Sequence, residues 1–441
     1  MLHKSLAVAV TLTALCLPAA AQSDSAAENT WSWRHRFELR GDYRWSADEE
    51  HPLRLQFPPD AVPPGRTNVF LETPDPGSHV ELNVADVQLD LRYGEMFAAR
   101  AKVHVQGLHR RNPTSSDRKI DADELFVRFG RLPEFLDRPE GTSFFVQAGK
   151  FPKMERQPTR LLESYGLAAT SFNRFEDVQL LTGGTIGRNL YWRFAAANGN
   201  PLFFRDSNAL AGDNGTPELL QRNPVTKYGS GFPILYNAET EELFYDGDHV
   251  QLGQGLGYRW AREDGTLGFD LIAFHYRRTL AQEEDLTGTF YGGDIDLLDG
   301  APQVGVGSLP ITSRVKEEYG ARLYAEWHKL TSTVQFTKQN VAGLQREGWE
   351  LETGYEIPFR FGPFEFIQPA ARLSGFTNRF TGPVTYTAPS VWWQWTKIDG
   401  GLRIGMKRGL DLTMEYTKHN VGSRRKLNLR ETLVTLRWRV G

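Results

Sequence analysis

The sequence predicts an all-β protein, a transmembrane antiparallel β-barrel with short periplasmic turns and long extracellular loops. Three observations support this prediction. Apolar and polar residues alternate along many segments, and the connections between these segments alternate between short and long along much of the chain. After the first twenty residues, no stretch is apolar for long enough to form a membrane-spanning helix. Barrel strands alternate apolar with polar residues, so a hydrophobic content of only 40% is compatible with a membrane protein.

Composition limits the remaining classes. The chain has 441 residues, with 51 Lys+Arg against 54 Asp+Glu and a formal net charge of -3. Its 12% aromatic content excludes a wholly disordered chain. The charge balance lacks the basic footprint that binding to a phosphate backbone requires, so we expect no nucleic acid partner.

Residues 1–21 have the pattern of a secretory signal peptide. Lys4 supplies the positive start, residues 6–17 form a short apolar core, and three alanines precede Gln22 at a small-residue cleavage site. We therefore expect export to the periplasm and a mature chain, 22–441, that forms one barrel domain. Cys16 lies in the signal, so the mature chain would contain no disulfide and no cysteine metal site.

The strand pattern is clearest between Trp33 and Trp45. Odd positions there are mostly aromatic or aliphatic and even positions are mostly charged. Such a segment has one apolar and one polar face, as a membrane strand between lipid and water requires. Similar segments give about sixteen strands, with a range of roughly sixteen to eighteen. They are 33–45, 87–93, 97–105, 125–129, 144–148, 178–180, 190–196, 250–260, 267–273, 319–327, 334–336, 349–357, 367–373, 402–406, 410–416 and 432–440.

The connections sort by length. Short ones are 93–95, 184–188, 262–265, the region of Lys329, 358–363 and 407–409, and long ones are 47–79, 152–174, 198–248, 280–316 and 376–390. This asymmetry is typical of an outer-membrane barrel. Two connections depart from it, since 131–142 is long for a periplasmic turn and 341–346 is short for an outer loop. A soluble propeller or sandwich array is the alternative, and no internal repeat of the propeller kind is present.

The layout resembles that of Gram-negative outer-membrane porins over nearly the whole mature chain. The final segment, 429–440, is similar to their C-terminal assembly signal, although the chain ends at Gly441 and not on an aromatic residue. Residues 147–152 (QAGKFP), followed by Phe175-Glu176-Asp177, resemble the phosphate-selective porins. Alginate-export barrels are a second family of similar appearance. The resemblance implies an outer-membrane location and passive passage of small hydrophilic solutes, and it allows a homotrimer or a monomer.

A barrel of this strand number is wide enough for an aqueous channel. Charges of both signs alternate with the apolar positions and would line that channel. The connection 152–174 is the one that porins of this class fold inward to narrow the pore, and it carries a cationic excess. Arginine can hold carboxylate or phosphate with two hydrogen bonds, so a bias toward anionic solutes is one hypothesis. A solvated surface loop is the other. The candidate solute contacts are Lys150, Lys153, Arg156, Arg160, Arg100, Lys102, Arg128, Arg36 and Arg40.

Other features were weighed on the same basis. Aromatic residues near strand ends suit interfacial girdles, or alternatively a sugar track. Acidic loops at 246–248 and 294–299 offer oxygen ligands for calcium without the spacing of an EF-hand, so a solvated acidic loop is favoured and no metal or cofactor is expected. Alternate glycines at Gly253, Gly255 and Gly257 suggest a place where a loop packs against the wall. No catalytic motif is present, so we expect no enzyme. Polysaccharide export and a non-conducting structural or adhesin barrel remain alternative functions.

Overall fold

The computed structural model describes residues 30–47, 50–53, 69–72, 77–106, 120–133, 136, 141–172, 176–199, 250–280, 312–379, 394–422 and 426–441. The expected signal peptide (1–21) and both acidic loops considered for calcium (246–248 and 294–299) lie outside these residues. No helix among the described residues is long and apolar enough to cross a membrane.

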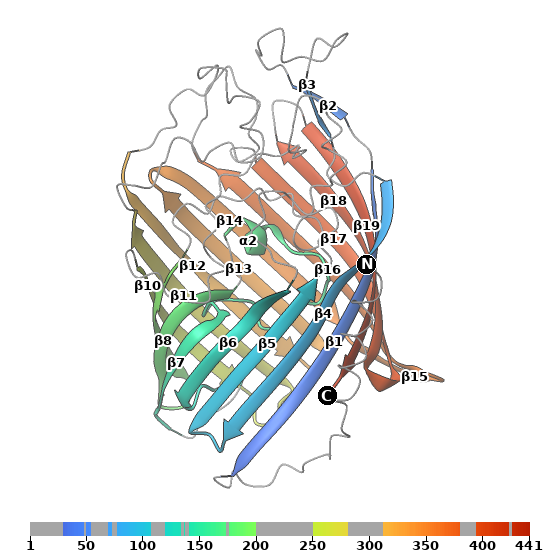
Figure 1. The fold of residues 1–441 in the computed structure, drawn as a ribbon. Coiled ribbons are helices and arrows are strands. Elements are labelled where there is room, and N and C mark those ends of the chain that lie inside the picture. The colour runs from blue at the N-terminus through green and yellow to red at the C-terminus, as the bar shows by residue number, and fades with distance from the viewer. Residues whose placement is uncertain are drawn as a thin grey trace, which may run out of the picture.

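Strands account for nearly all of the regular structure (Figure 1). In the first half they are β1 (Trp31–Ser46), β2 (Glu50–Leu53), β3 (Val69–Glu72), β4 (Gly77–Tyr93), β5 (Phe97–Gln106), β6 (Ile120–Gly130), β7 (Ser143–Pro152), β8 (Glu176–Ile186) and β9 (Leu190–Ala197). In the second half they are β10 (Gln251–Ala261), β11 (Leu267–Thr279), β12 (Val315–Trp327), β13 (Leu330–Val341), β14 (Leu344–Tyr355), β15 (Ile357–Phe361), β16 (Phe364–Asn378), β17 (Gln394–Met406), β18 (Leu410–Gly422) and β19 (Lys426–Val440). A short helix, α2 (Leu167–Ser171), follows β7, and a 3-10 turn, η8 (Lys407–Gly409), precedes β18.

The sheet closes on itself. Neighbouring strands pair antiparallel in chain order, and β1 pairs with β4 on one side and with β19 on the other. β14 and β15 lie one after the other along β16 and together form one wall position. β2 and β3 form a separate two-stranded sheet. The wall therefore has sixteen positions, which confirms the predicted fold class and strand number.

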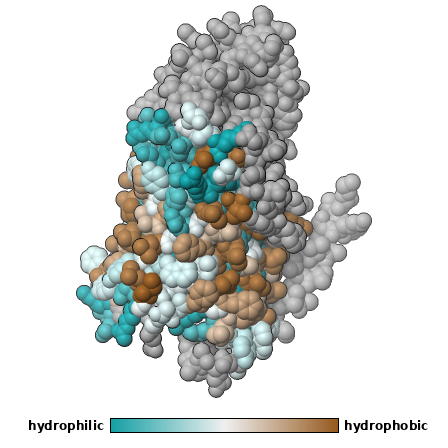
Figure 2. Space-filling view, turned by 90° about the vertical axis from the view of Figure 1, so that its left-hand side faces the viewer, coloured by the Kyte–Doolittle hydropathy of each residue, from teal (hydrophilic) through white to brown (hydrophobic). Residues whose placement is uncertain are grey.

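The two faces of the wall differ as the alternation predicts. On β14, Glu350 and Glu352 are 3% and 0% exposed, whereas their neighbours Trp349 and Leu351 are 44% and 37% exposed. Around the barrel, polar residues are likewise buried inside and apolar residues are exposed outside, which is the reverse of a soluble protein. Figure 2 shows apolar side chains gathered over the middle of one outer face, with hydrophilic ones above them. A closed barrel with this outer surface is built to be embedded in lipid.

The rims follow the predicted asymmetry in part. Short turns join β4 to β5, β8 to β9, β10 to β11, β12 to β13, β15 to β16 and β17 to β18. The C-terminal end of β19 lies at the same rim, because Trp438 pairs with Leu410 at the start of β18. The two expected exceptions are present, since 131–142 joins β6 to β7 and only Ala342 and Gly343 join β13 to β14. The structure adds a connection at 107–119, between β5 and β6, that the alternation did not single out as long.

A pair of adjacent substitutions tests the two faces. Val334 is 44% exposed near the middle of β13, between Leu323 and Leu351 of the neighbouring strands, whereas Gln335 points inward and is 4% exposed. We expect Val334→Arg to lower the free energy of unfolding by about 2–4 kcal/mol, because it places a charge in hydrocarbon. Gln335→Arg should cost clearly less. Urea unfolding in lipid vesicles, followed by tryptophan fluorescence, measures both values, and equal losses would contradict the assignment of faces.

Candidate functional site

Residues 153–172, which we call the inner segment, follow β7 and pack against the inside of the barrel wall. Its helix α2 contacts β13, β14 and β16 and is seen within the barrel (Figure 1). The side chains of Leu161, Leu162, Leu167 and Phe172 are at most 5% exposed. The segment is therefore packed as firmly as a protein core, although the wall around it is polar.

Carboxylates of the wall accept hydrogen bonds from the backbone of the inner segment. The N–H of Leu161 donates to Glu352 (2.6 Å), and the N–H of Ala168 donates to Glu350 (3.2 Å). The N–H groups of Glu163 and Ser164 both donate to Glu415, the second at 3.1 Å. An irregular backbone in a buried position needs such partners, because an unpaired N–H would be costly.

Cations of the wall donate hydrogen bonds to backbone carbonyls of the same segment. Arg372 Nη1 lies 2.8 Å from the oxygen of Ser164, and Lys397 Nζ lies 2.6 Å from the oxygen of Tyr165. Arg322 Nη1 donates to the oxygen of Arg156 at 3.0 Å. Arg372 is itself held by Glu352 and Asp399 at 3.0 and 2.9 Å. The wall thus satisfies both kinds of backbone group.

Glycines of the wall make room for the apolar side chains of the inner segment. A Cβ atom on Gly255 would lie 2.7 Å from Met154 Sδ, and one on Gly401 would lie 2.6 Å from a methyl carbon of Leu162. Gly354 faces Leu161 in the same way, at 3.0 Å, and Gly348 faces Phe172. The expectation that the glycines of β10 mark a packing surface for a loop is confirmed at Gly255.

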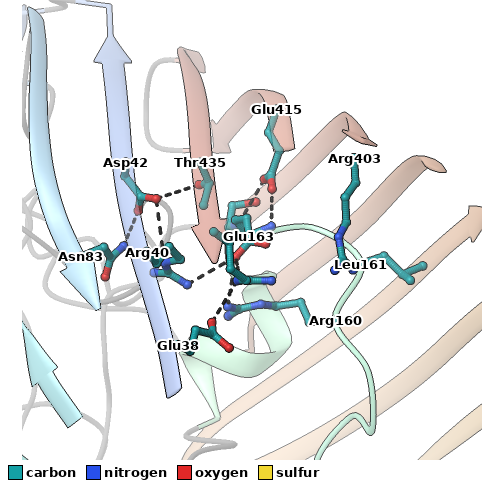
Figure 3. A network of polar contacts seen from close by, with 12 residues as sticks. Glu38, Arg40, Asp42, Asn83, Arg160, Leu161, Glu163, Arg403, Glu415 and Thr435 are labelled. Atoms are coloured by element: carbon teal, nitrogen blue, oxygen red, sulfur yellow. Dashed lines mark hydrogen bonds and ion pairs between the residues drawn. The ribbon is translucent and has the colours of Figure 1, made fainter. Parts of the chain in front are cut away.

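Glu163 joins the inner segment to the first and last strands (Figure 3). Its carboxylate lies 3.3 Å from Arg40 and 4.0 Å from Arg160, and it pairs with Arg437. Burial by itself would raise the pKa of Glu163, but the arginines, Arg437 first, outweigh it and lower the pKa from 4.5 to about 2. Glu163 is therefore ionised at neutral pH and clamps the segment to the seam at which the barrel closes.

A cavity of about 1260 Å³ remains between the inner segment and the strands that lie opposite it. Along β5 its lining extends from Ala98 to His104, and at the short-turn rim it includes Gly409 and Gly441. Six residues of strand correspond to about 20 Å, so the cavity follows much of the height of the wall. Its size and polar lining suit a passage for hydrated solutes.

The lining is strongly cationic. Among the described residues it includes sixteen Lys or Arg and eight Asp or Glu, a formal excess of eight positive charges. The cations are Arg36, Arg40, Arg92, Arg100, Lys102, Arg128, Lys150, Lys153, Arg156, Arg160, Arg193, Arg259, Arg322, Arg403, Arg437 and Arg439. The acids are Glu38, Asp86, Asp90, Asp121, Asp123, Glu124, Glu176 and Asp270.

All nine side chains singled out from the sequence line this one cavity: Lys150, Lys153, Arg156, Arg160, Arg100, Lys102, Arg128, Arg36 and Arg40. Several form ion pairs across the wall. Arg100 lies between Asp90 (2.6 Å) and Glu124 (3.1 Å). Lys102 contacts both Asp86 and Asp123, Lys150 lies 3.1 Å from Asp121, and Arg156 pairs with Glu176.

Sequence reasoning missed other polar residues of the lumen. Glu124 lines the cavity as the alternation predicts, but a register shift opposite Lys102 and Val103 breaks the alternation on β6 and brings its neighbour Asp123 into the lining as well. β17 begins at Gln394, earlier than the alternation suggested, and this brings Lys397 and Asp399 into the wall. Strict period two could not have found Asp123, whereas a longer prediction for β17 would have found Lys397 and Asp399.

The acids of β4 and β6 form the best arrangement for a metal ion in the described part of the chain. Asp86, His104 and Asp123 offer ligand atoms within 4.8 Å of one another. Lys102, however, pairs with both carboxylates, at 3.0 Å for Asp86. A metal ion would therefore have to displace an ammonium group, and the cluster is better described as part of the charged wall.

On the outer face the aromatic residues lie as an interfacial girdle requires. Trp31, Trp33, Trp327 and Trp438 are 63%, 66%, 56% and 42% exposed. Trp392 and Trp393 lie outside the described residues. This exposure favours the girdle over a sugar track, because a track would have to line the lumen.

A closed antiparallel barrel with a lipid-facing outer surface and a polar interior defines the class, which is the fold of the outer-membrane porins. The solved structures agree on the fold. The outer membrane channel DcaP of Acinetobacter baumannii matches with a TM-score of 0.52 and 7% identity, over 93% of this chain and 97% of that chain. OprB of Pseudomonas putida matches with a TM-score of 0.51 and 8% identity, over 92% and 94%. No family model matches the chain, and no curated protein matches it.

Substitutions at two neighbouring glycines test how the inner segment packs against the wall. We expect Gly401→Val to clash with Leu162, to cost about 1–3 kcal/mol of unfolding free energy, and to give a larger and noisier single-channel conductance as the segment loosens. Gly400→Val is the matched control, because a Cβ atom at Gly400 has no neighbour within 4 Å. Equal unfolding free energies and equal conductances of the two variants would show that Gly401 is not needed for the inner segment to pack against the wall.

The depressed pKa of Glu163 predicts a pH dependence. Its ion pairs stabilise the fold fully above pH 4.5, and this stabilisation is lost as the pH falls toward about 2. The unfolding free energy of the wild type minus that of Glu163→Gln should be on the order of 3 kcal/mol at pH 7 and should decrease below pH 4.5. Glu356→Gln, in an exposed turn pair with Lys329, should show no such profile. A difference that stays constant down to pH 2.5 would contradict the ion-pair assignment.

Proposed function

We propose that this protein is an outer-membrane porin that allows passive diffusion of small hydrophilic solutes and favours anionic ones. The observation that carries the proposal is the contrast between the cavity and the whole chain. The chain has a formal net charge of -3, whereas the described lining of the cavity carries an excess of eight positive charges. Such a passage attracts anions and repels cations.

The inner segment supports the role of a constriction that the sequence suggested for 152–174. Lys153, Arg156 and Arg160 all lie on its cavity side. β4 and β6 carry five of the eight acids, each close to a cation, and Asp123 and Glu124 offer oxygens within 4.8 Å of Glu176, the ion-pair partner of Arg156. A solute that passes the inner segment would meet cations and acids side by side, with the cations in excess, and its anionic groups would be attracted to those cations.

The geometry gives less support to the alternatives. A non-conducting structural or adhesin barrel would have no use for a cavity along its wall. A polysaccharide exporter would gain more from exposed aromatic faces inside the lumen. Of the aromatic residues in the described lining, Phe151 and Tyr191 are buried, and Phe126 and Tyr165 are half-buried beneath the guanidinium groups of Arg100 and Arg160. Planar-bilayer conductance distinguishes the channel from a blocked barrel.

The anion preference is tested by Arg156→Ala with Arg160→Ala. Removal of two cations from the inner segment should lower the permeability ratio of chloride to potassium about twofold to fivefold, since each charge acts through water and salt at short range. The measurement is the reversal potential in a KCl gradient across a planar bilayer.

Arg156→Lys with Arg160→Lys is the matched control, because it keeps both charges and should keep the chloride preference. Arg262→Ala with Lys329→Ala removes two exposed cations from the turns and should also leave the ratio unchanged. An unaltered ratio in the double alanine variant would reject the inner segment as the selectivity element. A wild-type protein that prefers potassium would reject the anion proposal altogether.

A further inference from the structure

β15 continues the lipid-facing row of the wall beyond the neighbouring turn. Leu351 and Tyr355 of β14 are 37% and 48% exposed on the outer face, and the same odd-numbered row continues with Ile357 (45%), Phe359 (41%) and Phe361 (72%). Apart from the half-buried Thr353, the row is therefore apolar from the membrane strand to the hairpin. Figure 1 shows β15 projecting sideways from the barrel at the rim of short turns.

The strand has an open edge. Among the described strands β15 pairs only with β16, through Ile357 with Ile367, Pro358 with Phe366 and Phe361 with Phe364. On its other side, the neighbouring strand β13 begins only at Leu330. The carbonyl oxygen of Lys329 accepts a hydrogen bond from the N–H of Glu356 (2.9 Å), the residue before β15. All five residues of β15 are exposed, so both of its faces lack protein cover in the described structure.

The β15–β16 hairpin carries an exposed aromatic cluster, which is unfavourable in water. The rings of Phe359 and Phe361 lie 6.4 Å apart, and those of Phe359 and Phe364 lie 6.2 Å apart, which makes a small exposed aromatic cluster. Arg360 lies between the two phenylalanines in the sequence and is exposed on the alternate face. Aromatic rings beside a cation are the composition that prefers the boundary between lipid headgroups and acyl chains.

We propose that the β15–β16 hairpin is a lipid anchor: Ile357, Phe359 and Phe361 insert into the inner leaflet of the outer membrane, and Arg360 contacts phospholipid phosphate. Lipid is chosen over a second copy of the chain for two reasons. The apolar row is continuous with the lipid-facing wall, and a five-residue strand offers far less than the roughly 1,000 Å² that a stable protein interface buries. A bilayer boundary also covers both faces of the strand, whereas a flat partner covers one.

Single spin labels test the anchor in the folded channel. Cys16 is the only cysteine of the chain, so a Cys16→Ser background allows one label per variant. The test positions are Phe361→Cys and Arg360→Cys. Leu351→Cys is the lipid-facing reference, and Arg188→Cys, in the exposed turn between β8 and β9 at the same rim, is the aqueous reference.

In phospholipid vesicles we expect the label at 361 to collide with a water-soluble nickel chelate several-fold less than the label at 188, and with oxygen nearly as often as the label at 351. The label at 360 should lie between the two references. Equal nickel accessibility at 361 and 188 would overturn the proposal and leave the hairpin in the periplasm. Spin–spin broadening at 361 that disappears on dilution with unlabelled protein would also overturn it, in favour of contact between two copies. Both readouts are independent of ion selectivity.

Discussion

The structure depends on hydrogen bonds between the wall and the buried backbone of the inner segment. A wall of sixteen strands encloses more space than its own side chains fill, and an irregular segment placed inside it has backbone N–H and C=O groups that no sheet can satisfy. Glu352 and Glu415 accept its N–H groups, and Arg372 and Lys397 donate to its carbonyls. Each group would be costly without the others, so wall and segment form one unit.

Apolar packing and charge act on the same segment in different ways. Wall glycines such as Gly255 and Gly401 leave room for Met154 and Leu162, which sets how closely the segment approaches the strands. Glu163 then fixes its position along the seam through Arg40 and Arg437. The result is a passage of limited width along one side of the lumen, with the remaining cations of the segment facing it.

The distribution of charge connects this architecture to the proposed transport function. Glu350, Glu352 and Glu415, which accept hydrogen bonds from the backbone of the inner segment, are not part of the cavity lining, whereas many arginines of the same wall are. A chain with a slight negative charge can therefore present a positive passage, because its carboxylates are used for structure. Net charge alone gives no indication of this arrangement, since it sums groups that the solute meets and groups that it does not.

The amino-acid sequence by itself determined the class of fold, the number of strands and the face to which each residue of a regular strand belongs. Alternation is a local property, so segments such as 33–45 reveal it without any tertiary information. It also placed five of the nine candidate cations on the inside of the barrel, whereas Lys150, Lys153, Arg156 and Arg160 rested on the resemblance to porins. Only the tertiary structure decided which of the polar residues hold the inner segment, that a bulge brings Asp123 inward beside Glu124, and that β15 projects from the barrel at the rim of short turns. These features depend on residues distant in sequence, such as Glu163 and Arg437, whose proximity exists only once the barrel has closed.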